Sequence, residues 1–444
     1  MRRSGWRPTP FRDVVLKVHQ RCNLACDYCY VYTMADQTWR GRPPVMDRRT
    51  WRTAARRTAA HARRHDLPGM RLVLHGGEPL LAGTGVLDEL ITGFRRAFPP
   101  GRRLDVQIQT NGTLLDEGVL AMFRRHGVRV GVSLDGAAAD NDGHRRHRDG
   151  RGSSAAVDRG LRLLASPEHA GSFAGLLCTI DPATDPIECF EALLAHRPPA
   201  IDLLLPHANW SHPPGRAASY ADWLIAVFDR WYDAPRQETS IRLFEDVMAL
   251  LLGGAGRSEQ VGLSPVAVVV VETDGAIELS DSLKSSYPGA GATGLTVFAD
   301  EFDAALSHPG VVARQIGAAA LSPTCLACDL HTVCGGGHYA HRYRRPDGYR
   351  NPSVYCEDLA AFIRHVHRRM SADLGAGRPG PGVAVTPGRA APSAPRAAPR
   401  ASPTVPAAGR DPSPAATSGS PARPASRPRP PGGPPRSPGS RAAR

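Results

Sequence analysis

The sequence contains no run of 18 apolar residues and only two lysines among its 55 basic residues. The first absence excludes a transmembrane helix, because crossing the bilayer core takes about 20 predominantly apolar residues. The basic start, MRRSGWRPTPFRD, also lacks the apolar segment of a secretory signal. We therefore expect a cytoplasmic protein with no membrane partner. Thiols stay reduced in that compartment, so grouped cysteines indicate metal binding rather than disulfides.

Residues 376–444 hold no aromatic residue, no lysine and no glutamate, but 18 of the 41 prolines. Such a segment buries too little apolar surface to offset its ordering entropy, so we predict a disordered tail over residues 373–444. Its 11 arginines and one aspartate contribute 11 − 1 = +10 to the net charge of +13, which leaves 13 − 10 = +3 for the rest. We therefore expect no nucleic-acid partner for the folded part. The tail's composition is explained by GC-rich coding, with an electrostatic tether as the alternative.

Strand-like apolar runs alternate with amphipathic helical stretches in the first half of the chain. The expected strands cover residues 14–19, 71–75, 104–110, 128–134, 173–180 and 201–206. Asp47 is the expected N-cap of one intervening helix, and another places Val86, Leu87, Leu90, Ile91 and Phe94 on one face. Alternating units indicate a parallel sheet, and six are too few for a closed eight-stranded barrel. We predict an α/β fold, a partial (β/α)6 barrel of the TIM type, over residues 1–215.

Two further regions precede the predicted tail. Residues 216–320 combine helical patterns with the strand-like run PVAVVVVETDG, and we interpret them as a bridging region. Residues 321–372 form a cysteine-rich region that ends in the helical stretch CEDLAAFIRHVHRRM.

Unusual loops follow the first four expected strands. They are Cys22-x3-Cys26-x2-Cys29, HGGEP (75–79), TNG (110–112) and SLDG (133–136). Because barrel-type sheets build their active sites at the carboxyl ends of the strands, these loops are expected to share one rim. Three thiolates can hold a [4Fe–4S] cluster and leave its fourth iron open. Zinc with His19 as a fourth ligand, or three merely buried thiols, are the alternatives.

The CxxxCxxC loop, with Tyr28 before its last cysteine, resembles the signature of radical S-adenosylmethionine (SAM) enzymes. The resemblance implies a [4Fe–4S] cluster on Cys22, Cys26 and Cys29 that binds SAM. It implies that Gly76, Gly77 and Glu78 hold the methionine amino group, and that Asn111 and Ser133 lie near the ribose. Arg145 is implied as the partner of the SAM carboxylate, although Arg146 and Arg148 are close in sequence.

A second cysteine set has the pattern Cys325-x2-Cys328-x5-Cys334-x21-Cys356. It resembles the SPASM extension of radical SAM peptide-modifying enzymes, which implies an auxiliary [4Fe–4S] cluster; zinc on four thiolates is the alternative. SPASM proteins with two auxiliary clusters carry a further cysteine where this chain has His338. We therefore predict two clusters in total, and interpret Cys178 and Cys189 as core thiols.

Four segments, HQRCNLACDYCYVY, LLPHANW, VVVETDGAIELSDSLKSSY and CGGGHYAHRYR…NPSVYC, resemble the FxsB-type peptide maturases. The resemblance implies a cyclophane: a C–C bond between an aromatic ring and the Cβ of a nearby residue in a ribosomally made precursor peptide. It also implies an electron donor such as flavodoxin or ferredoxin. Asp281, Glu272 and His207 are the candidate bases, by their place in these segments.

Three other functions remain open from the residues. One is a sulfatase-maturase-type enzyme that forms formylglycine, and another is a thioether-forming or epimerising peptide modification. The third is not enzymatic: an iron–sulfur or zinc sensor.

Overall fold

The computed structural model of the protein describes residues 6–215 and 218–375, so the predicted tail falls outside the described residues from residue 376 onward. Six parallel strands confirm the predicted α/β barrel: β1 (Asp13–His19), β2 (Gly69–Gly76), β3 (Arg103–Thr110), β4 (Arg129–Ser133), β5 (Phe173–Thr179) and β6 (Ala200–Leu204). They pair in chain order, so the carboxyl ends of neighbouring strands meet on one rim.

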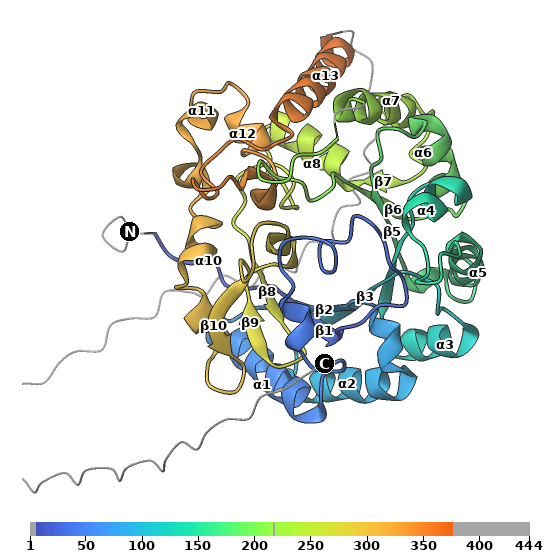
Figure 1. The fold of residues 1–444 in the computed structure, drawn as a ribbon, viewed down its shortest axis with the longest axis vertical. Helices are drawn as coiled ribbons and strands as arrows, with labels where there is room; N and C mark the ends of the chain where they lie inside the picture. The colour runs from blue at the N-terminus through green and yellow to red at the C-terminus, as the bar shows by residue number, and fades with distance from the viewer. Residues whose placement is uncertain (1–5, 216–217, 376–444) are drawn as a thin grey trace, which may run out of the picture. The chain divides into compact units, whose positions relative to one another are not determined.

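Helices connect these strands and lie around the outside of the sheet (Figure 1). They are α1 (Arg48–Arg64), α2 (Thr84–Ala97), α3 (Glu117–Arg125), α4 (Ala138–His144), α5 (Ser154–Leu164) and α6 (Pro186–Leu194). Asp47 caps α1 as predicted, because its carboxylate accepts a 2.7 Å hydrogen bond from the Thr50 amide. The predicted face of α2 is buried except at Val86, which is partly exposed.

The bridging region continues the same sheet on both sides. It contains α7 (Tyr220–Tyr232), β7 (Ser240–Ile241), α8 (Arg242–Leu251), β8 (Val268–Val271), β9 (Ala276–Glu278) and β10 (Ala292–Thr296). β7 pairs with β6, while β8 runs parallel to β1 with Val271 opposite Leu16. The hairpin of β9 and β10 completes the order β10-β9-β8-β1-β2-β3-β4-β5-β6-β7. Sequence periodicity treated this region as separate, but pairing with β1 joins it to the barrel.

The cysteine-rich region consists of short helices and one long one. They are α11 (Pro323–Leu326), α12 (His331–Cys334) and α13 (Cys356–Gly375). Two further short helices, α9 (Phe302–Ala305) and α10 (Pro309–Ala313), end the bridging region. Short 3-10 helices cover Thr38–Gly41, Pro79–Ala82, Ala170–Ser172, Asp281–Ser285, Gly317–Ala320 and Tyr339–Arg342. α13 packs on α7 and α8, where Phe362 contacts Phe228 and Phe244, and it extends to Gly375, past the predicted boundary at residue 372.

Among the described helices, none is both long and apolar enough to cross a bilayer.

Candidate active site

A cleft of about 230 Å³ opens at the carboxyl ends of the barrel strands. The loop after β1 crosses the middle of the molecule (Figure 1). Its residues form one wall of the cleft. The other walls come from the ends of β2 to β6, and the lining includes Gly76, Gly77, Asn111, Ser133, Arg145 and His207. Most of the site residues predicted for the first rim therefore lie around one cavity.

Cys22, Cys26 and Cys29 all line this cleft. The loop that carries them is held by its backbone: the Ala25 amide donates to the Arg146 carbonyl at 2.7 Å, and the Leu24 amide points at the Cys22 sulfur at 3.4 Å. Amide contacts to sulfur stabilise a thiolate, and hydrogen bonds of this kind tune iron–sulfur clusters.

The thiols of this loop fit a cluster better than a single zinc ion. In the described part of the chain, no three cysteine sulfurs lie within 4.8 Å of one another. Zinc binds every sulfur at about 2.3 Å and so draws its donors to about 4 Å apart, whereas a cubane binds each thiolate through a different iron. His19, the alternative fourth zinc ligand, directs its Nδ1 to the Arg21 backbone instead.

Burial makes these thiols hard to ionise without a bound cation. Burial raises the pKa of Cys22 to about 12 and that of Cys26 to about 11, and it also raises the pKa of Cys29. A coordinating metal deprotonates a thiol outright, so the trio has the chemistry of a ligand set rather than of free nucleophiles.

Gly76 and Gly77 are pressed against the cysteine loop. The amide of Gly77 donates to the His19 carbonyl at 2.8 Å, and that of Glu78 to the Arg21 carbonyl at 2.9 Å. A Cβ on Gly77 would lie 1.9 Å from the Tyr32 hydroxyl, so only glycine allows this approach.

Glu78 turns its carboxylate away from the cleft. One oxygen accepts from the Leu80 amide at 2.9 Å and the Thr110 hydroxyl at 2.7 Å, and the other accepts from the Asn111 amide at 2.8 Å. The side chain is fully buried, and this burial raises its pKa despite the three hydrogen bonds. Glu78 therefore joins the loops after β2 and β3, and it does not line the cleft.

Asn111 and Ser133 line the cleft with their side chains already engaged. The side-chain Nδ2 of Asn111 donates to the Asn23 side chain at 2.8 Å and contacts the Cys22 sulfur at 3.7 Å. Its Oδ1 accepts from the Thr113 backbone amide at 3.0 Å. The Ser133 hydroxyl accepts from Gln109 at 3.0 Å. Asn111 thus ties the β3 loop to the cysteine loop.

Of the three neighbouring arginines, Arg145 alone lines the cleft, whereas Arg146 and Arg148 are exposed. Arg145 is 8% exposed and donates to the Tyr28 hydroxyl at 2.7 Å, and its Nε has no partner. Burial opposes its charge, but Tyr28 and Asp135 outweigh burial and raise its pKa. The sequence did not indicate that Tyr28 and Asp135 hold this arginine.

Glu272, one predicted base, is enclosed by cations. Its first oxygen lies 2.6 Å from Arg42 and 2.7 Å from Lys284, and its second accepts from Gln20 at 2.7 Å. Burial opposes ionisation of Glu272, but Lys284 and Lys17 outweigh it and lower its pKa. Glu272 does not line the cleft, so its place is in the supporting ion network.

Asp281, a second predicted base, keeps one oxygen without a partner. Its Oδ2 pairs with Lys17 at 2.7 Å and lies 3.6 Å from His75, while its buried Oδ1 accepts no hydrogen bond. Burial opposes ionisation, but Lys17 and Lys284 hold the pKa of Asp281 below its ordinary value. His75 lines the cleft, and its Nδ1 lies 3.2 Å from the Lys17 ammonium. His75 therefore lies between the Lys17–Asp281 pair and the cleft.

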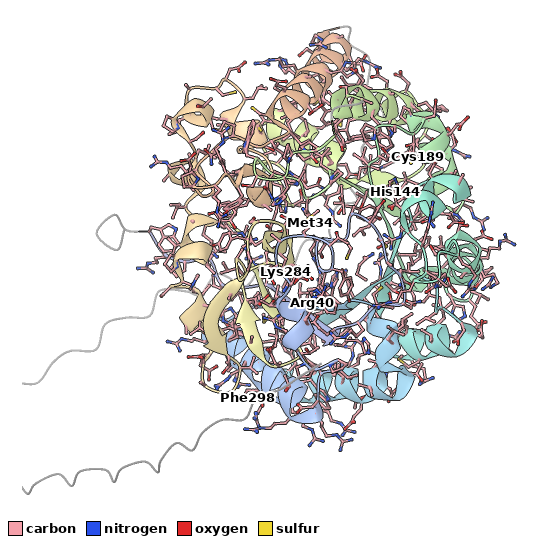
Figure 2. All side chains as sticks on the ribbon, viewed as in Figure 1. Met34, Arg40, His144, Cys189, Lys284 and Phe298 are labelled. Atoms are coloured by element: carbon pink, nitrogen blue, oxygen red, sulfur yellow. The ribbon has the colours of Figure 1, made fainter. Side chains whose placement is uncertain are left out.

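Lys17 and His75 were missed by sequence reasoning, although a signal was present. Lys17 and Lys284 are the two lysines of the whole chain, and both are buried in this network. Figure 2 places Lys284 near the middle of the molecule, where its carbonyl accepts from the Asp36 amide at 3.0 Å.

His207, the third predicted base, follows β6 and lines the cleft. Its ring meets Tyr30 edge-on at 4.9 Å. Burial, with a contribution from His338, lowers its pKa to about 3. This imidazole is therefore neutral across the physiological range.

The second cysteine set is brought together by helix ends. Cys325 lies in α11, Cys334 ends α12 and Cys356 begins α13, while Cys328 follows α11. The chain turns sharply after Cys334 through Gly335, at φ +61°, where a Cβ would lie 1.8 Å from the Gly262 carbonyl. Burial raises the pKa of Cys334 to about 11, and Cys356 and Cys325 add to the shift.

The remaining cysteines, Cys178 and Cys189, are buried with their sulfurs 4.0 Å apart, away from both sets. His338 is not among the thiols of its region; it lies beside His207 and His341.

Comparisons with known proteins agree with this geometry. Residues 16–166 match the radical SAM superfamily. The serine-type anaerobic sulfatase-maturating enzyme of Klebsiella aerogenes is 27% identical over 75% of this chain and 81% of its own length. The cysteine-type enzyme of Clostridium perfringens is 22% identical over 81% of this chain and 97% of its own. The structure of native anSMEcpe with bound AdoMet and Cp18Cys peptide superposes with a TM-score of 0.70, at 18% identity, over 82% of this chain and 99% of that one.

Proposed function

Since the chain is an enzyme of the radical SAM class, with SAM and [4Fe–4S] clusters as cofactors, we propose that it is a peptide maturase that oxidises a substrate side chain at Cβ. The observation that carries the proposal is the convergence of three loop cysteines, the glycine pair after β2 and a buried arginine on one cleft. The peptide substrate is inferred from the sulfatase-maturating relative that is 27% identical.

When they are bound, the reduced cluster and SAM would supply an adenosyl radical that can take a hydrogen atom from an unactivated carbon. The chain's own residues orient and shield this chemistry. Cys22, Cys26 and Cys29 would hold the cluster, and the backbone at Gly76 and Gly77 would face the methionine amino group. The Nε of Arg145 would meet the methionine carboxylate, because this buried N–H makes no hydrogen bond and an anion would satisfy it.

The proposed reaction is a two-electron oxidation of the peptide. One hydrogen atom leaves Cβ, and then one electron and one proton leave the substrate. The second cysteine set would take the electron, because four thiolates ligate a cluster completely and leave no iron for substrate. Cys325, Cys328, Cys334 and Cys356 are therefore proposed as the auxiliary-cluster ligands.

Asp281 is the proposed acceptor of the proton. Its unpaired Oδ1 is free to accept, and Lys17 keeps the carboxylate ionised. His75 connects this pair to the cleft through its contact with Lys17. Glu272 has no free oxygen and is proposed to hold Lys284 and Arg42 in place.

Two products are compatible with oxidation at Cβ. Formylglycine is favoured by the curated relatives, which are serine- and cysteine-type sulfatase-maturating enzymes. A cyclophane is favoured by the segments that resemble FxsB-type maturases, and by the replacement of a further cluster cysteine by His338. In the second case the carbon radical adds to an aromatic ring before the electron and proton leave.

The test uses anaerobically prepared full-length protein with dithionite and SAM. We expect 5′-deoxyadenosine, and the absence of this product would overturn the proposal. The Cp18Cys peptide and its serine variant serve as probes for formylglycine, whose aldehyde is captured by a hydrazide. Co-expression with short peptides encoded beside the gene probes the cyclophane, which appears as a loss of two hydrogens without an aldehyde.

A further inference from the structure

Three histidines from distant parts of the chain meet at the edge of the cleft. His207 follows β6, and His338 and His341 lie in the loop after α12. One ring nitrogen from each lies within 4.8 Å of the other two. The ring centroids are 5.2 Å apart for His207 and His338, 5.7 Å for His207 and His341, and 4.9 Å for His338 and His341.

The nitrogens of this triad lack the partners that buried imidazoles ordinarily find. Both nitrogens of His341 and Nδ1 of His207 are buried without a hydrogen bond. His338 receives only a long bond of 3.3 Å from the Ala340 amide. Buried polar groups are usually satisfied, and an unsatisfied set in one place indicates an absent ion or water.

A second histidine cluster in the same protein shows the contrast. His61 and His65 also lie within 4.8 Å of a common partner, Asp303. Their ring nitrogens bond to its carboxylate, at 3.1 Å for His61 and 2.5 Å for His65. In that cluster the Asp303 carboxylate joins both imidazoles and only Nε2 of His61 is buried without a partner, whereas no carboxylate joins the three imidazoles of the triad.

We infer that His207, His338 and His341 form a mononuclear site for a divalent transition-metal ion of the zinc type, separate from both cysteine sets. Imidazole nitrogen is a preferred ligand of zinc, at about 2.0–2.1 Å, and three protein ligands leave one coordination position open. Closing the nitrogens onto one ion requires them to move together by about an ångström, from the Zn–N length. The inference goes beyond the proposed oxidation and does not depend on it.

The surroundings are compatible with a bound cation. Burial keeps the three imidazoles neutral, with the pKa of His207 and of His338 lowered to about 3, so a metal does not compete with protons. Arg314 and Arg342 lie near His338, but each is already engaged. Arg314 pairs with Glu259 at 2.5 Å, and Arg342 donates to the carbonyls of the glycine run after Cys334 at 2.6 Å and 2.7 Å.

His207 lines the cleft, so the proposed site borders the substrate side through this residue. A water or a polar atom of the substrate would fill the open coordination position. SPASM proteins with two auxiliary clusters carry a cysteine at the position of His338. In this chain the proposed site would use the histidine at that position as a metal ligand.

The experiment measures zinc on the full chain with its clusters assembled anaerobically. Protein dialysed against zinc and then against a weak chelator is analysed for zinc, iron and sulfide by mass spectrometry. We expect one zinc per chain in the wild type, a complete loss of that zinc in His338→Ala and His341→Ala, and no loss in His367→Ala or His65→Ala. Zinc-edge absorption should show nitrogen and oxygen ligands without sulfur.

Three outcomes would overturn the inference. They are wild-type protein without zinc, zinc that persists in both triad variants, and sulfur in the zinc coordination shell. Because His341 is buried and its alanine variant could unfold, His338→Gln and the iron content of each variant serve as checks. Iron at the wild-type level with zinc lost supports the site, and iron lost together with zinc in every triad variant counts against it.

Discussion

The guanidinium of Arg145 donates a 2.7 Å hydrogen bond to the hydroxyl of Tyr28, which in turn donates to the carboxylate of Asp135. Tyr28 lies between Cys26 and Cys29, so the cation of the cleft and the cluster loop are held by one chain of hydrogen bonds. Asp135 is anchored in turn by the Thr179 amide at 2.9 Å. The aromatic residue of the CxxxCxxC motif therefore positions an arginine from a distant loop.

Removing Arg145 should weaken SAM binding. Hydrogen bonds to charged groups contribute about 1.5–3 kcal/mol, so Arg145→Ala should reduce SAM affinity about 10- to 150-fold. Equilibrium binding of SAM to the cluster-loaded protein measures this. Arg146→Ala is the matched control because its side chain is exposed, and it should bind SAM normally. Equal losses in both variants would show that Arg145 has no special role.

Glu78→Gln should destabilise the fold rather than only weaken SAM binding. The Thr110 hydroxyl and the Asn111 backbone N–H now donate to the Glu78 carboxylate. In the glutamine variant, the side-chain NH₂ would face one of these donors in place of an acceptor. An unsatisfied buried group costs about 1–3 kcal/mol. We expect a melting temperature several degrees lower. In the control Glu89→Gln the melting temperature should change little, because its half-exposed pair with Arg48 contributes about 0–1 kcal/mol. A melting temperature equal to wild type would contradict the buried bridging role.

Substitutions in the two cysteine sets should have different effects on SAM cleavage and on peptide oxidation. Cys22→Ala or Cys29→Ala should abolish 5′-deoxyadenosine formation and remove about four irons per chain, the content of one cubane. Cys334→Ala should lose a similar amount of iron but retain SAM cleavage, with peptide oxidation reduced. Cys189→Ala is the control, with full iron content. Iron analysis and quantitative chromatography check these outcomes, and SAM cleavage retained without Cys22 would refute the cluster assignment.

Asp281 and Glu272 should differ in what their amide variants lose. General bases contribute about 100- to 10,000-fold, so Asp281→Asn should lower peptide oxidation by at least about 100-fold while SAM cleavage continues. Glu272→Gln removes one carboxylate from the pairs with Lys284 and Arg42, which keep Glu278 as a partner, and breaking such buried pairs costs up to about 3–5 kcal/mol. Its main effect should be a lower melting temperature. If Glu272→Gln lost peptide oxidation and Asp281→Asn lost only thermal stability, Glu272 would be the base instead.

His144 should make the cysteine loop pH-sensitive. His144 lies 3.0 Å from Asp181 and 3.0 Å from Asp27, which follows Cys26; its position is labelled in Figure 2. Burial opposes its protonation, but Asp181 and Asp27 outweigh burial and raise its pKa. The two ion pairs are therefore fully present below the unfolded pKa of about 6.5 and are lost as pH rises through the higher folded value.

Amide hydrogen exchange across residues 22–30, corrected for intrinsic rates, should accordingly increase between pH 6 and pH 8.5. His144→Gln should remove this dependence, because its amide does not titrate. The groups are partly exposed, so salt should weaken the effect. Unchanged protection in the wild type over this range would contradict the prediction.

Much of the fold could be predicted because its signals are local. The six strands, the Asp47 cap and the buried face of α2 depend on apolar periodicity and capping within a few residues. The loops at the carboxyl ends of the strands followed from the same reasoning, because a parallel sheet places them on one rim. The attachment of β8 to β1 was not predicted, since pairing between strands about 250 residues apart leaves no local pattern.

The candidate site divides in the same way. Cysteine spacing identified both thiol sets, but it carried no information on how Glu78 turns or which arginine enters the cleft. The sequence offered Glu272, Asp281 and His207 as candidate bases only by their place in the segments that resemble FxsB-type maturases. Their contacts distinguish them, because both oxygens of Glu272 already have partners whereas Oδ1 of Asp281 has none.

The sequence alone indicated the class of chemistry, because thiols separated by three and two intervening residues on one loop can reach a common centre. Tertiary structure decided which groups act and which only support. Lys17 with Asp281, Tyr28 with Arg145, and His207 with His338 and His341 are each brought together by chain segments more than a hundred residues apart. Burial then sets the charge and the hydrogen-bond needs of each group, and no short stretch of sequence encodes that.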